Sequence, residues 1–434
     1  MSKILRSVSV LVRMTMLLSL VAVALPAGAR GDKPFAGETI RILFVTDPFA
    51  FATQKIVDRL QEATGATIQL EVVPYDAVHQ KILLNSQQKE SAYEAVSVDI
   101  VWEGEFCAAK ALLPLDGLIA ASKFDKSDFL EAAWSEAQCQ GKQMGIPLQP
   151  HPEILWYRKD IFQAKGIKPP ETTDELLKIA AQLNDPKNNF YGIAFNGARG
   201  QPLGQQVAHF YAAFGQHLFD EKWHPTLNTP DGVRAAKYFM ELKKYAPPDI
   251  LNMAWDERAR QFAQGGAAMC YEWGARSFMA EDPSNSVVSG KVGYVAAPHA
   301  PDKPAVTPNG EWSISIPSNV KNRKLAWEFV QWFTDKKQLK ELAKAGNSGM
   351  PRYSIIRDPE LVKMYPVFPA VDAIAQKGQL KDWMRPAIPE WPFLADTFGT
   401  VFHEMLSGSI TPEQATKKAQ DIMDAKMKED GYYK

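Results

Sequence analysis

The sequence lacks an excess of charge of either sign. Its 49 lysines and arginines nearly balance 50 aspartates and glutamates, which leaves a formal net charge of −1. A protein that binds nucleic acid or an anionic lipid surface normally carries a basic patch or stripe. We therefore expect no nucleic-acid partner. The chain also lacks internal repeats and low-complexity tracts.

The common motifs of nucleotide, metal and hydrolase sites are missing as well. There is no G-x-G-x-x-G and no G-x-x-x-x-G-K-[ST], and the glycines of GARGQPLG (197–204) have the wrong spacing. H-E-x-x-H is absent, the seven histidines are scattered, and GNSG (346–349) is not a G-x-S-x-G elbow. We expect no cofactor and no metal. Nothing marks two carboxylates as converging, so a secreted glycoside hydrolase is the weaker alternative.

One hydrophobic run stands out, and it lies at the N-terminus. Lys3, Arg6 and Arg13 precede an apolar stretch at 14–25, followed by Pro-Ala-Gly-Ala. This pattern predicts a signal peptide over residues 1–29, because the run is too short to span a bilayer. No cysteine lies near the cleavage site, so we expect a periplasmic protein without a lipid anchor.

The sequence has three cysteines, which would then lie in an oxidising compartment. A Cys107–Cys139 disulfide is one expectation, and three unpaired thiols are the alternative. Cys270, in GGAAMCYEW, is typical of a small buried apolar residue.

The remaining chain is long enough for more than one core. It has 434 residues, 46% of them hydrophobic, so we expect two lobes. Strands at 39–45, 67–73 and 98–101 alternate with helices, of which the first begins after Asp47-Pro48 and ends at Gly65. This order predicts a parallel sheet with crossover helices.

A second pattern of the same kind begins near residue 150. Strands are expected at 153–157, 190–195 and 267–273, with a capping box at Thr172 and Glu175. The Pro-rich run at 297–310 predicts a linker, followed by a strand at 311–317 and an amphipathic helix. Residues 351–434 are expected to be mostly helical.

Aromatic and polar residues gather where these strands end. In open parallel sheets, ligands bind outside the carboxyl ends of the strands. An indole can stack on the C–H face of a sugar, while carboxylates, amides and guanidinium groups bind its hydroxyls. The candidates are Asp47, Phe49, Trp102, Glu103, Glu105, Gln149, His151, Arg199, Trp273 and Arg276.

Each candidate has a purely structural alternative. Trp102 and Trp273 could belong to a core, and Glu103 with Glu105 could favour the start of the next helix. His151 and Arg199 could be ordinary surface residues.

The order of several segments resembles the sugar-binding, family 1 extracellular solute-binding proteins of ABC importers, the group that includes maltose-binding protein. The segments are EATGATIQLEVVPYD (62–76), VDIVWEGEF (98–106), GIPLQPHPEILWYRKDIF (145–162), GGAAMCYEW (265–273), NGEWSISIPSNVKNRKLAWEFVQWFTD (309–335) and SGMPRYSI (348–355). The resemblance implies an α/β, two-lobed periplasmic-binding-protein fold (type II) with hinge strands between the lobes and the ligand in the cleft.

The resemblance also implies lobe boundaries. We expect lobe 1 to comprise 30–148 and 299–345, and lobe 2 to comprise 149–298 and 346–434. The chain would cross at GIPLQPHPE (145–153), at 297–305 and near 336–350.

Further site residues are implied in the same way. Trp102 and Glu103 would face the ligand from lobe 1, and Trp273 from lobe 2. The family usually has a Gly-Gly-Trp turn where this chain has Asn309 and Gly310, and the inserted Glu311 displaces Trp312. The resemblance adds Arg352, Glu390 and Trp391 to the candidates.

These observations predict a periplasmic substrate-binding protein of an ABC importer, which binds a mono- to oligosaccharide and delivers it to permease subunits. We expect a monomer that is not an enzyme. The alternative ligand is a polyol, a sugar phosphate or an acidic sugar, with Arg199, Arg276 and Arg352 as anion contacts.

Overall fold

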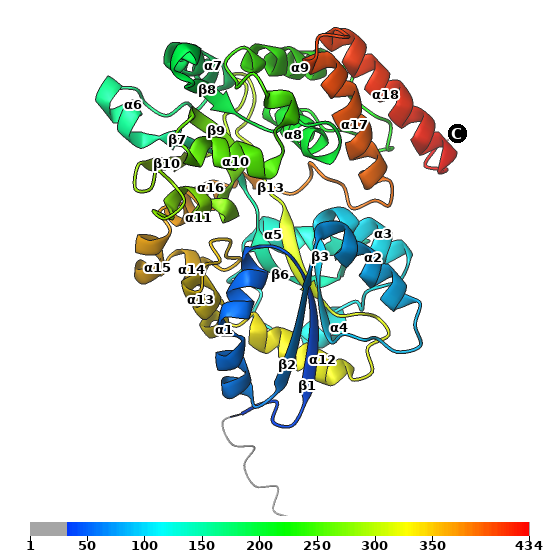
Figure 1. Cartoon of the computed structure of the whole chain (residues 1–434). Helices are drawn as coiled ribbons and strands as arrows, with labels where there is room; N and C mark the ends of the chain where they lie inside the picture. Colours follow the sequence, from blue (N-terminus) through cyan, green and yellow to red (C-terminus); the bar gives the residue numbers. More distant parts are fainter. Residues whose placement is uncertain (1–32, 434) are drawn as a thin grey trace, which may run out of the picture.

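The computed structural model describes residues 33–433. The expected signal peptide lies outside the described residues. Between residues 33 and 433, the helices are each too short or too polar to cross a membrane. Figure 1 shows two α/β lobes, each built around its own sheet.

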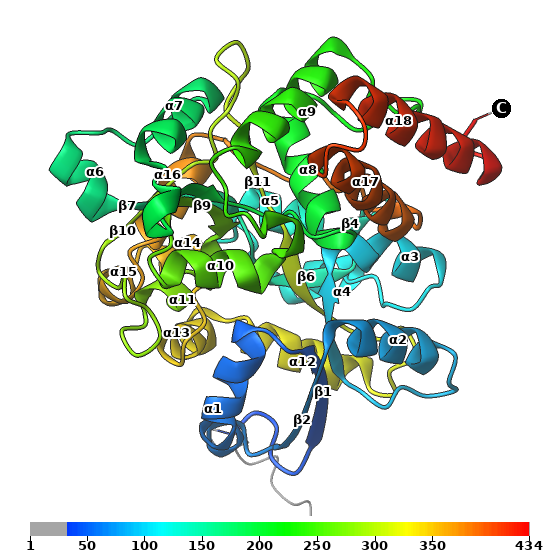
Figure 2. The same ribbon diagram turned by 45° about the horizontal axis from the view of Figure 1, so that its top comes forward.

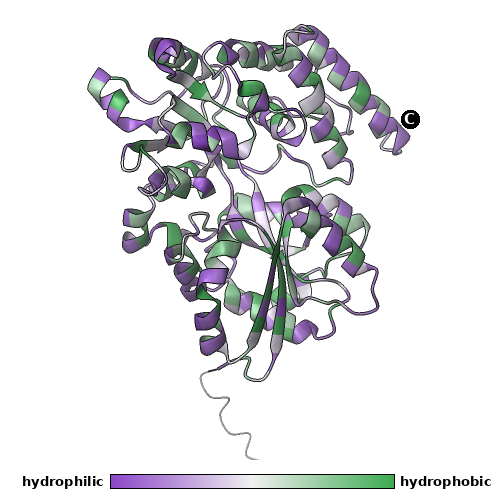
Figure 3. Cartoon of the chain, in the orientation of Figure 1, coloured by the Kyte–Doolittle hydropathy of each residue, from purple (hydrophilic) through white to green (hydrophobic). Residues whose placement is uncertain are grey.

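The first lobe contains a five-stranded sheet with the order β2-β1-β3-β12-β6. β1 is parallel to β2 and β3, whereas β12 is antiparallel to both β3 and β6. Figure 3 shows that β1 is predominantly hydrophobic, and four of its side chains are fully buried. The strands are β1 (Thr39–Val45), β2 (Thr67–Val73), β3 (Ala95–Asp99), β6 (Gly145–Pro150) and β12 (Glu311–Ser315).

The third strand lies earlier than expected, because a 3₁₀ turn (Ile100–Trp102) begins where the apolar run continues. The Asp99 carboxylate accepts a hydrogen bond from the Val101 N–H at 3.4 Å and so caps this turn. The apolar run 98–101 therefore includes a buried turn, which periodicity alone does not distinguish from a strand.

Helices flank this sheet. The expected first helix is present, with Pro48 at its first position and Gly65 in the left-handed region after its end. Asp47 occupies the N-cap position, but its side chain makes no capping hydrogen bond. The helices are α1 (Pro48–Thr64), α2 (Tyr75–Ser86), α3 (Glu103–Ala108), α4 (Asp116–Ser122), α5 (Glu131–Glu136), α12 (Arg323–Phe333) and α13 (Lys336–Lys344).

A disulfide joins Cys107 of α3 to Cys139 of the short hairpin β4 (Gln138–Cys139) and β5 (Lys142–Gln143). Cys270 is buried and free, as expected for a small apolar residue. The disulfide fixes α3 to the body of the first lobe.

The second lobe contains a four-stranded sheet with the order β10-β7-β9-β8. Only β8 and β9 are parallel, and β7 is antiparallel to both of its neighbours. The second pattern in the sequence therefore does not repeat the parallel arrangement of the first. The strands are β7 (Glu153–Arg158), β8 (Tyr191–Ala194), β9 (Ala267–Trp273) and β10 (Val292–Val295).

Helices cover this second sheet, and the predicted capping box of Thr172 and Glu175 is present at the start of α7. Figures 1 and 2 show α17 close to α3 of the first lobe. The helices are α6 (Lys159–Lys165), α7 (Thr173–Leu183), α8 (Gln201–Ala213), α9 (Pro230–Lys243), α10 (Trp255–Ala263), α11 (Phe278–Glu281), α17 (Trp391–Leu406) and α18 (Pro412–Glu429).

Three chain segments run side by side between the lobes. The chain leaves the first sheet at Pro150 and enters the second at Glu153. His151 exchanges backbone hydrogen bonds with Gly310, at 2.7 and 3.1 Å. β11 (Thr307–Pro308) pairs in parallel with β13 (Leu380–Lys381). The hinge thus comprises 150–152, 307–310 and 379–381.

Two of the expected crossings lie later in the sequence than predicted. Ala300 donates its N–H to the carbonyl oxygen of Ala213 at 2.8 Å, so the run 297–305 still lies on the second lobe. Conversely, Tyr353 donates to the carbonyl oxygen of Asp128, which places the segment after residue 346 on the first lobe. There it forms α14 (Tyr353–Ile356) and α15 (Pro359–Met364), and α16 (Phe368–Gln376) follows.

Candidate functional site

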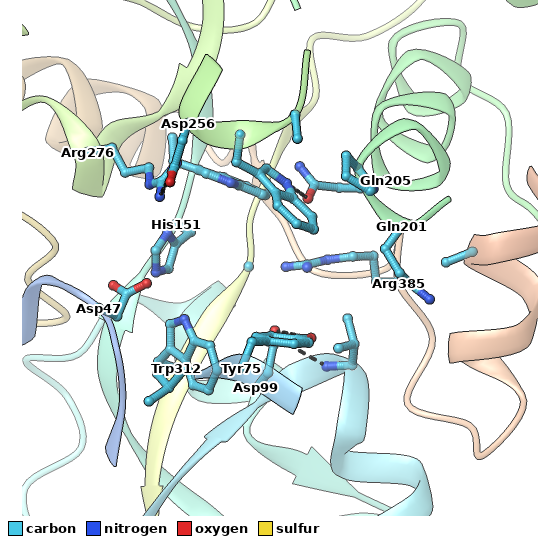
Figure 4. Close-up of a pocket in the computed structure, with 18 of the residues that line it drawn as sticks. Asp47, Tyr75, Asp99, His151, Gln201, Gln205, Asp256, Arg276, Trp312 and Arg385 are labelled. Atoms are coloured by element: carbon cyan, nitrogen blue, oxygen red, sulfur yellow. Dashed lines mark hydrogen bonds and ion pairs between the residues drawn. The ribbon is translucent and has the colours of Figure 1, made fainter. Parts of the chain in front are cut away.

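A hollow of about 560 Å³ lies between the two lobes next to the hinge. Figure 4 shows side chains from both lobes pointing into it. It is lined by Val45, Thr46, Asp47, Tyr75, Asp76, Asp99, Val101, His151, Gln201, Pro202, Gln205, Ala254, Trp255, Asp256, Glu257, Trp273, Arg276, Gly310, Glu311, Trp312, Arg385, Trp391 and Ala395. We call this hollow the inner cleft.

Aromatic rings form the first-lobe wall of the inner cleft. Trp312 of β12 lies directly opposite Asp99 of β3 in the strand register. The centroid of its ring lies 6.0 Å from that of Tyr75 and 5.4 Å from that of Trp102. The Tyr75 hydroxyl donates to the Asp99 carboxylate at 3.0 Å. The first-lobe wall therefore offers a ligand a flat aromatic surface next to a carboxylate.

Asp47 stands at one end of this wall, where Gln149 holds its carboxylate. The Gln149 side-chain nitrogen donates to Asp47 Oδ1, and it also lies 2.8 Å from His151 Nε2. Burial in the cleft raises the pKa of Asp47 to about 6, against the lowering effects of Arg276 and Gln149. Burial, together with Arg276 and Arg385, holds the pKa of His151 well below its usual range. His151 is therefore neutral at neutral pH.

The second-lobe wall supplies hydrogen-bond donors that have no partner in the described residues. Arg276 Nη2 pairs with Asp256 Oδ1 at 2.5 Å, whereas the buried Nη1 is unpaired. The Trp255 indole N–H donates to Gln205 Oε1 at 2.8 Å, and Gln205 Nε2 is likewise buried without a partner. Buried polar groups normally have partners, so these donors are suited to a bound ligand.

Arg385 reaches into the middle of the inner cleft from the irregular segment before α17 (Figure 4). Its Nη2 atom donates to the carbonyl oxygen of Asn309 at 3.3 Å. A Cβ atom on Gly310 would lie 1.8 Å from the same Nη2. The guanidinium can take this position only because residue 310 has no side chain.

The charge of Arg385 also acts on Asp99 across the cleft. Burial raises the pKa of Asp99, and the positive charge of Arg385 opposes this rise.

A buried ionic network supports Trp273 from behind. Arg258 pairs with Glu153 at 2.6 Å and with Glu272 at 2.9 Å, and all three side chains are at most 1% exposed. Glu272 accepts the backbone N–H of Trp273 at 2.8 Å, and the His209 ring lies edge-on to the indole. Removing one member of such a network is costly, because it leaves a buried charge unpaired. The network therefore fixes the indole at the cleft wall.

The structure places the expected site residues in three groups. The first group lines the inner cleft, and the second lines an adjacent hollow nearer the surface. The first comprises Asp47, His151, Trp273, Arg276, Gly310 and Trp391, and the second comprises Trp102, Glu105 and Glu390.

The third group lines neither hollow. Phe49 packs in the first-lobe core, and Glu103 is buried with Ser313 Oγ 3.4 Å from its carboxylate. Gln149 and Asn309 are buried beneath the cleft, where they hold Asp47 and Glu136. Arg199 is exposed on the second lobe.

Arg352 also lies outside the two hollows, on the first lobe. It lies 3.5 Å from Asp128, and its guanidinium stacks 3.9 Å from the centroid of the Phe129 ring. Six residues of the expected set therefore line neither hollow, namely Phe49, Glu103, Gln149, Asn309, Arg199 and Arg352.

Several lining residues were missed by the sequence analysis. Tyr75 follows the end of β2, so the rule applied to the first and third strands would have found it. The extra Glu311 in the sequence predicts a displaced Trp312. The Glu311 carboxylate accepts the N–H groups of Leu148 and Gln149 at a bulge after Trp312, which leaves the indole on the cleft wall. Further lining residues outside the expected set include Asp99, Gln201, Gln205, Trp255, Asp256 and Arg385.

The inner cleft thus offers indole and phenol faces, carboxylates, amides and two guanidinium groups. Within residues 33–433, no cluster of histidine, cysteine, aspartate and glutamate could hold a metal ion. This combination suits a compact ligand with many hydroxyl groups and C–H surfaces. The volume lies in the ordinary range for small-molecule sites.

Comparisons with known proteins agree with this geometry. Residues 45–340 match the family described as bacterial extracellular solute-binding protein. A mannitol-binding protein of Pseudomonas aeruginosa is 24% identical, over 96% of this chain and 98% of its own length. A probable amino-acid ABC transporter periplasmic-binding protein of Sinorhizobium fredii is 26% identical, over 95% of each chain.

A solved structure is also similar over nearly its whole length. It is an ABC transporter solute-binding protein from Agrobacterium radiobacter K84 in complex with ribitol. The two chains are 30% identical, with a TM-score of 0.82, and the match covers 91% of this chain and 100% of that one.

Proposed function

This chain belongs to the bacterial extracellular solute-binding protein family, and from that premise we propose that it binds a neutral polyol or small sugar in the inner cleft. In this proposal the bound protein delivers its ligand to the permease subunits of an ABC importer. It acts as a periplasmic monomer, and it is not an enzyme. Closure of the lobes about the three-stranded hinge is the functional motion.

The chemistry of the inner cleft is the observation that supports this function best. Trp312 and Tyr75 on one lobe and Trp255 and Trp273 on the other offer aromatic surface to C–H groups. Carboxylates accept hydrogen bonds from hydroxyls, while the unpaired donors of Arg276 and Gln205 can bind hydroxyl oxygens. A polyol or sugar satisfies both kinds of group with one molecule.

The charges near the cleft favour a neutral ligand over a sugar phosphate or an acidic sugar. Of the three arginines considered as anion contacts, Arg199 is exposed and Arg352 stacks on Phe129 outside the cleft. Arg276 is already paired with Asp256, and the charge of Arg385, the other lining arginine, acts on Asp99, where it opposes the rise of that pKa. Asp47 and Asp99 line the opposite wall and would repel an anion.

Relatives support a polyol within this class. The mannitol-binding protein and the ribitol complex both concern linear polyols, and each match extends over more than nine-tenths of this chain. Cyclic sugars, from mono- to oligosaccharides, have the same hydroxyl and C–H pattern and stay in the proposal. The relative from Sinorhizobium fredii, a probable amino-acid ABC transporter periplasmic-binding protein, adds a ligand class to the test rather than a second function.

The proposal is tested by titration calorimetry on the folded, ligand-free protein. The panel contains erythritol, ribitol, D-mannitol, sorbitol, glucose and maltose, with mannitol 1-phosphate, glucuronate and glutamate as charged compounds. We expect micromolar or tighter binding of at least one neutral compound and weaker binding of its charged analogue. Ligand at about 100 times Kd would stabilise the fold by about 2.7 kcal/mol, which a melting curve detects.

Two outcomes would overturn the proposal. Binding of only glutamate or a phosphate would show that the cleft prefers anions. Release of glucose from maltose would favour the hydrolase alternative. Asp99→Asn is the site variant for any neutral ligand that binds, and Asp125→Asn, an exposed residue on the first lobe, is its control.

A further inference from the structure

The irregular segment 382–390, between β13 and α17, is held against the first lobe at two places. At its start, the Ser135 hydroxyl of α5 donates a hydrogen bond to the Asp382 carboxylate. Near its end, a Cβ atom on Gly104 of α3 would overlap the backbone of Ile388, so the chain here lies in direct contact with that helix. First-lobe helices therefore fix the segment on both sides of the arginine that it carries into the inner cleft.

The two helices that hold this segment are themselves linked. The disulfide joins Cys107 of α3 to Cys139, which lies shortly after the end of α5. A covalent bond between these two parts of the first lobe limits how far the helices can separate. The two contacts with the segment thus belong to one connected part of that lobe.

Glu136, the last residue of α5, extends this support to the hinge. Its side chain is buried, and Oε2 accepts a hydrogen bond from the side-chain nitrogen of Asn309. The backbone of Asn309 in turn donates to the carbonyl oxygen of Lys381 at 2.9 Å and accepts from Arg385 Nη2 at 3.3 Å. One hinge residue therefore connects the first-lobe carboxyl to the guanidinium in the cleft.

The carbonyl of Asn309 is the main constraint on the direction of this guanidinium. In the described part of the chain, Arg385 forms no ion pair with a carboxylate, and its Nε atom is buried without a partner. Its charge nevertheless acts on Glu136: burial raises the pKa of Glu136 well above its usual range, and Arg385 is the largest influence that opposes this rise. A shift of Asn309 would move the guanidinium relative to a bound ligand.

Resting on the function proposed above, we propose that Glu136 is a positioning residue for ligand binding in the inner cleft. It acts through Asn309, which holds the guanidinium of Arg385 in place. Ser135 supports the same arrangement by fixing the start of the segment. Glu136 itself does not line the cleft, so its effect on a ligand passes through the arginine. In this way a first-lobe helix sets the position of a cation that rests on Trp273 of the second lobe.

A double-mutant cycle tests this role. Titration calorimetry compares the wild type with Glu136→Met, Arg385→Met and the double variant. Ribitol and D-mannitol are the first probes, and the other neutral compounds of the panel follow. Methionine has nearly the length of glutamate but leaves the Asn309 side chain without an acceptor.

We expect Glu136→Met to weaken binding by about 5- to 50-fold in the wild-type background, since a buried donor left unpaired can shift its chain segment. The double variant should bind at most about twofold more weakly than Arg385→Met alone, because the two residues act as a unit. Unchanged affinity of Glu136→Met, or an equal loss in both backgrounds, would overturn the proposal.

Glu136→Gln tests whether the hydrogen bond is the cause. Glutamine keeps a side-chain oxygen that can accept from Asn309, so this variant should bind within about threefold of the wild type. If Glu136→Gln bound as weakly as Glu136→Met, the contact with Asn309 would not position the arginine, and the proposal would fail.

Glu103→Met is the matched control, because Glu103 is also a buried first-lobe glutamate but contacts Ser313 rather than Asn309. It should change the unfolding free energy without weakening binding. If it weakened binding as much as Glu136→Met does, the loss would reflect general destabilisation, and Glu136 would have no special role.

Ser135→Ala provides a milder variant if Glu136→Met does not fold. Ser135 is half-buried, and the change removes one hydroxyl. Binding should weaken by about two- to fivefold in the wild-type background and should not change in the Arg385→Met background. An equal loss in both backgrounds, or no loss in either, would overturn the proposal.

The design separates this inference from the proposed function. If the wild type binds a neutral compound and the Glu136 and Ser135 variants bind it equally well, only the positioning role fails. If the wild type binds none of the neutral compounds, the proposed function itself fails.

Discussion

The guanidinium carbon of Arg385 lies 5.6 Å from the centroid of the Trp273 ring, so a cation from the segment before α17 rests on the aromatic wall of the second lobe. The hydrogen bond that the structure gives this guanidinium goes to a neutral carbonyl, that of Asn309. Most of its donors therefore remain for the cleft. The stacking holds the plane of the group while those donors face a ligand.

Arg385→Lys should weaken ligand binding by about 10- to 100-fold, measured by titration calorimetry with the tightest compound of the panel. Lysine keeps the charge but loses the planar fork and the stacking on Trp273. Hydrogen bonds to charged groups contribute about 1.5–3 kcal/mol each, which sets this range. Arg199→Lys is the control and should bind as the wild type does. Equal affinity of Arg385→Lys and wild type would remove Arg385 from the site.

Binding of a neutral ligand should weaken as the pH falls below 6. The Asp47 carboxylate has a pKa of about 6, and its protonation removes a hydrogen-bond acceptor from the cleft wall. If binding requires the ionised form, affinity at pH 5 should be about tenfold lower than at pH 8. Calorimetry across this range measures the change. Asp47→Asn should bind more weakly and without this inflection, and a variant that keeps the inflection would assign it to another group.

Glu103→Gln should stabilise the protein at alkaline pH. Burial raises the pKa of Glu103 from 4.5 to about 8, so the folded state retains a proton that the unfolded chain has lost. The stabilising contribution of this group is complete below pH 4.5 and disappears as the pH rises through 8, at about 1.4 kcal/mol per pKa unit. Glutamine has the shape of the protonated acid and does not titrate.

Melting curves from pH 5 to pH 9 measure this effect. The melting temperature of Glu103→Gln relative to wild type should rise with pH, whereas the exposed Glu131→Gln should follow the wild type. A constant difference across the range would contradict a titrating buried carboxyl.

The Cys107–Cys139 disulfide gives a prediction that needs no ligand. The unfolded, non-reduced protein should show one free thiol, from Cys270, and three after reduction. Because the bond spans a sequence separation of 32, the double variant Cys107→Ser/Cys139→Ser should lose about 3–4 kcal/mol of first-lobe stability in denaturant unfolding. Three free thiols before reduction would show that the bond does not form.

Local sequence patterns predicted the parts of the fold that depend on local order. The apolar run at 39–45, the Pro48 start and the Gly65 end of α1 are set by neighbouring residues, and the structure has them as expected. The antiparallel β7 was missed, because strand direction depends on the route of the whole chain and leaves no local periodicity.

In the site too, local sequence predicts some of the residues, and tertiary packing decides the others. Asp47 follows the end of β1 and Trp273 is the last residue of β9, and both line the cleft as the strand-end rule predicts. The rule did not separate Glu103 from Glu105, since a short helix turns one carboxylate into the core and leaves the other at the adjacent hollow that Trp102 and Glu390 also line. Arg385 lies in an irregular segment whose position over Gly310 follows only from tertiary packing.

The two second-lobe tryptophans should separate the effects of binding and stability. Trp255 is partly exposed and donates its indole N–H to Gln205, whereas Trp273 is 6% exposed and lies between His151 and His209. Trp255→Ala should weaken ligand binding by about 1–3 kcal/mol and change the unfolding free energy little. Trp273→Ala should lose about 3–5 kcal/mol of stability, because its removal leaves a cavity against the Arg258 network, and should also weaken binding.

Denaturant unfolding and calorimetry, both below the melting range of the weaker variant, measure the free energy of unfolding and the binding affinity separately. Trp273→Phe, which keeps a ring in place, should recover most of the stability but only part of the affinity. If Trp273→Ala melted far lower and yet bound the ligand as tightly as the wild type, Trp273 would be a core residue. Trp255 would then be the second-lobe indole that remains to stack on the ligand near the hinge.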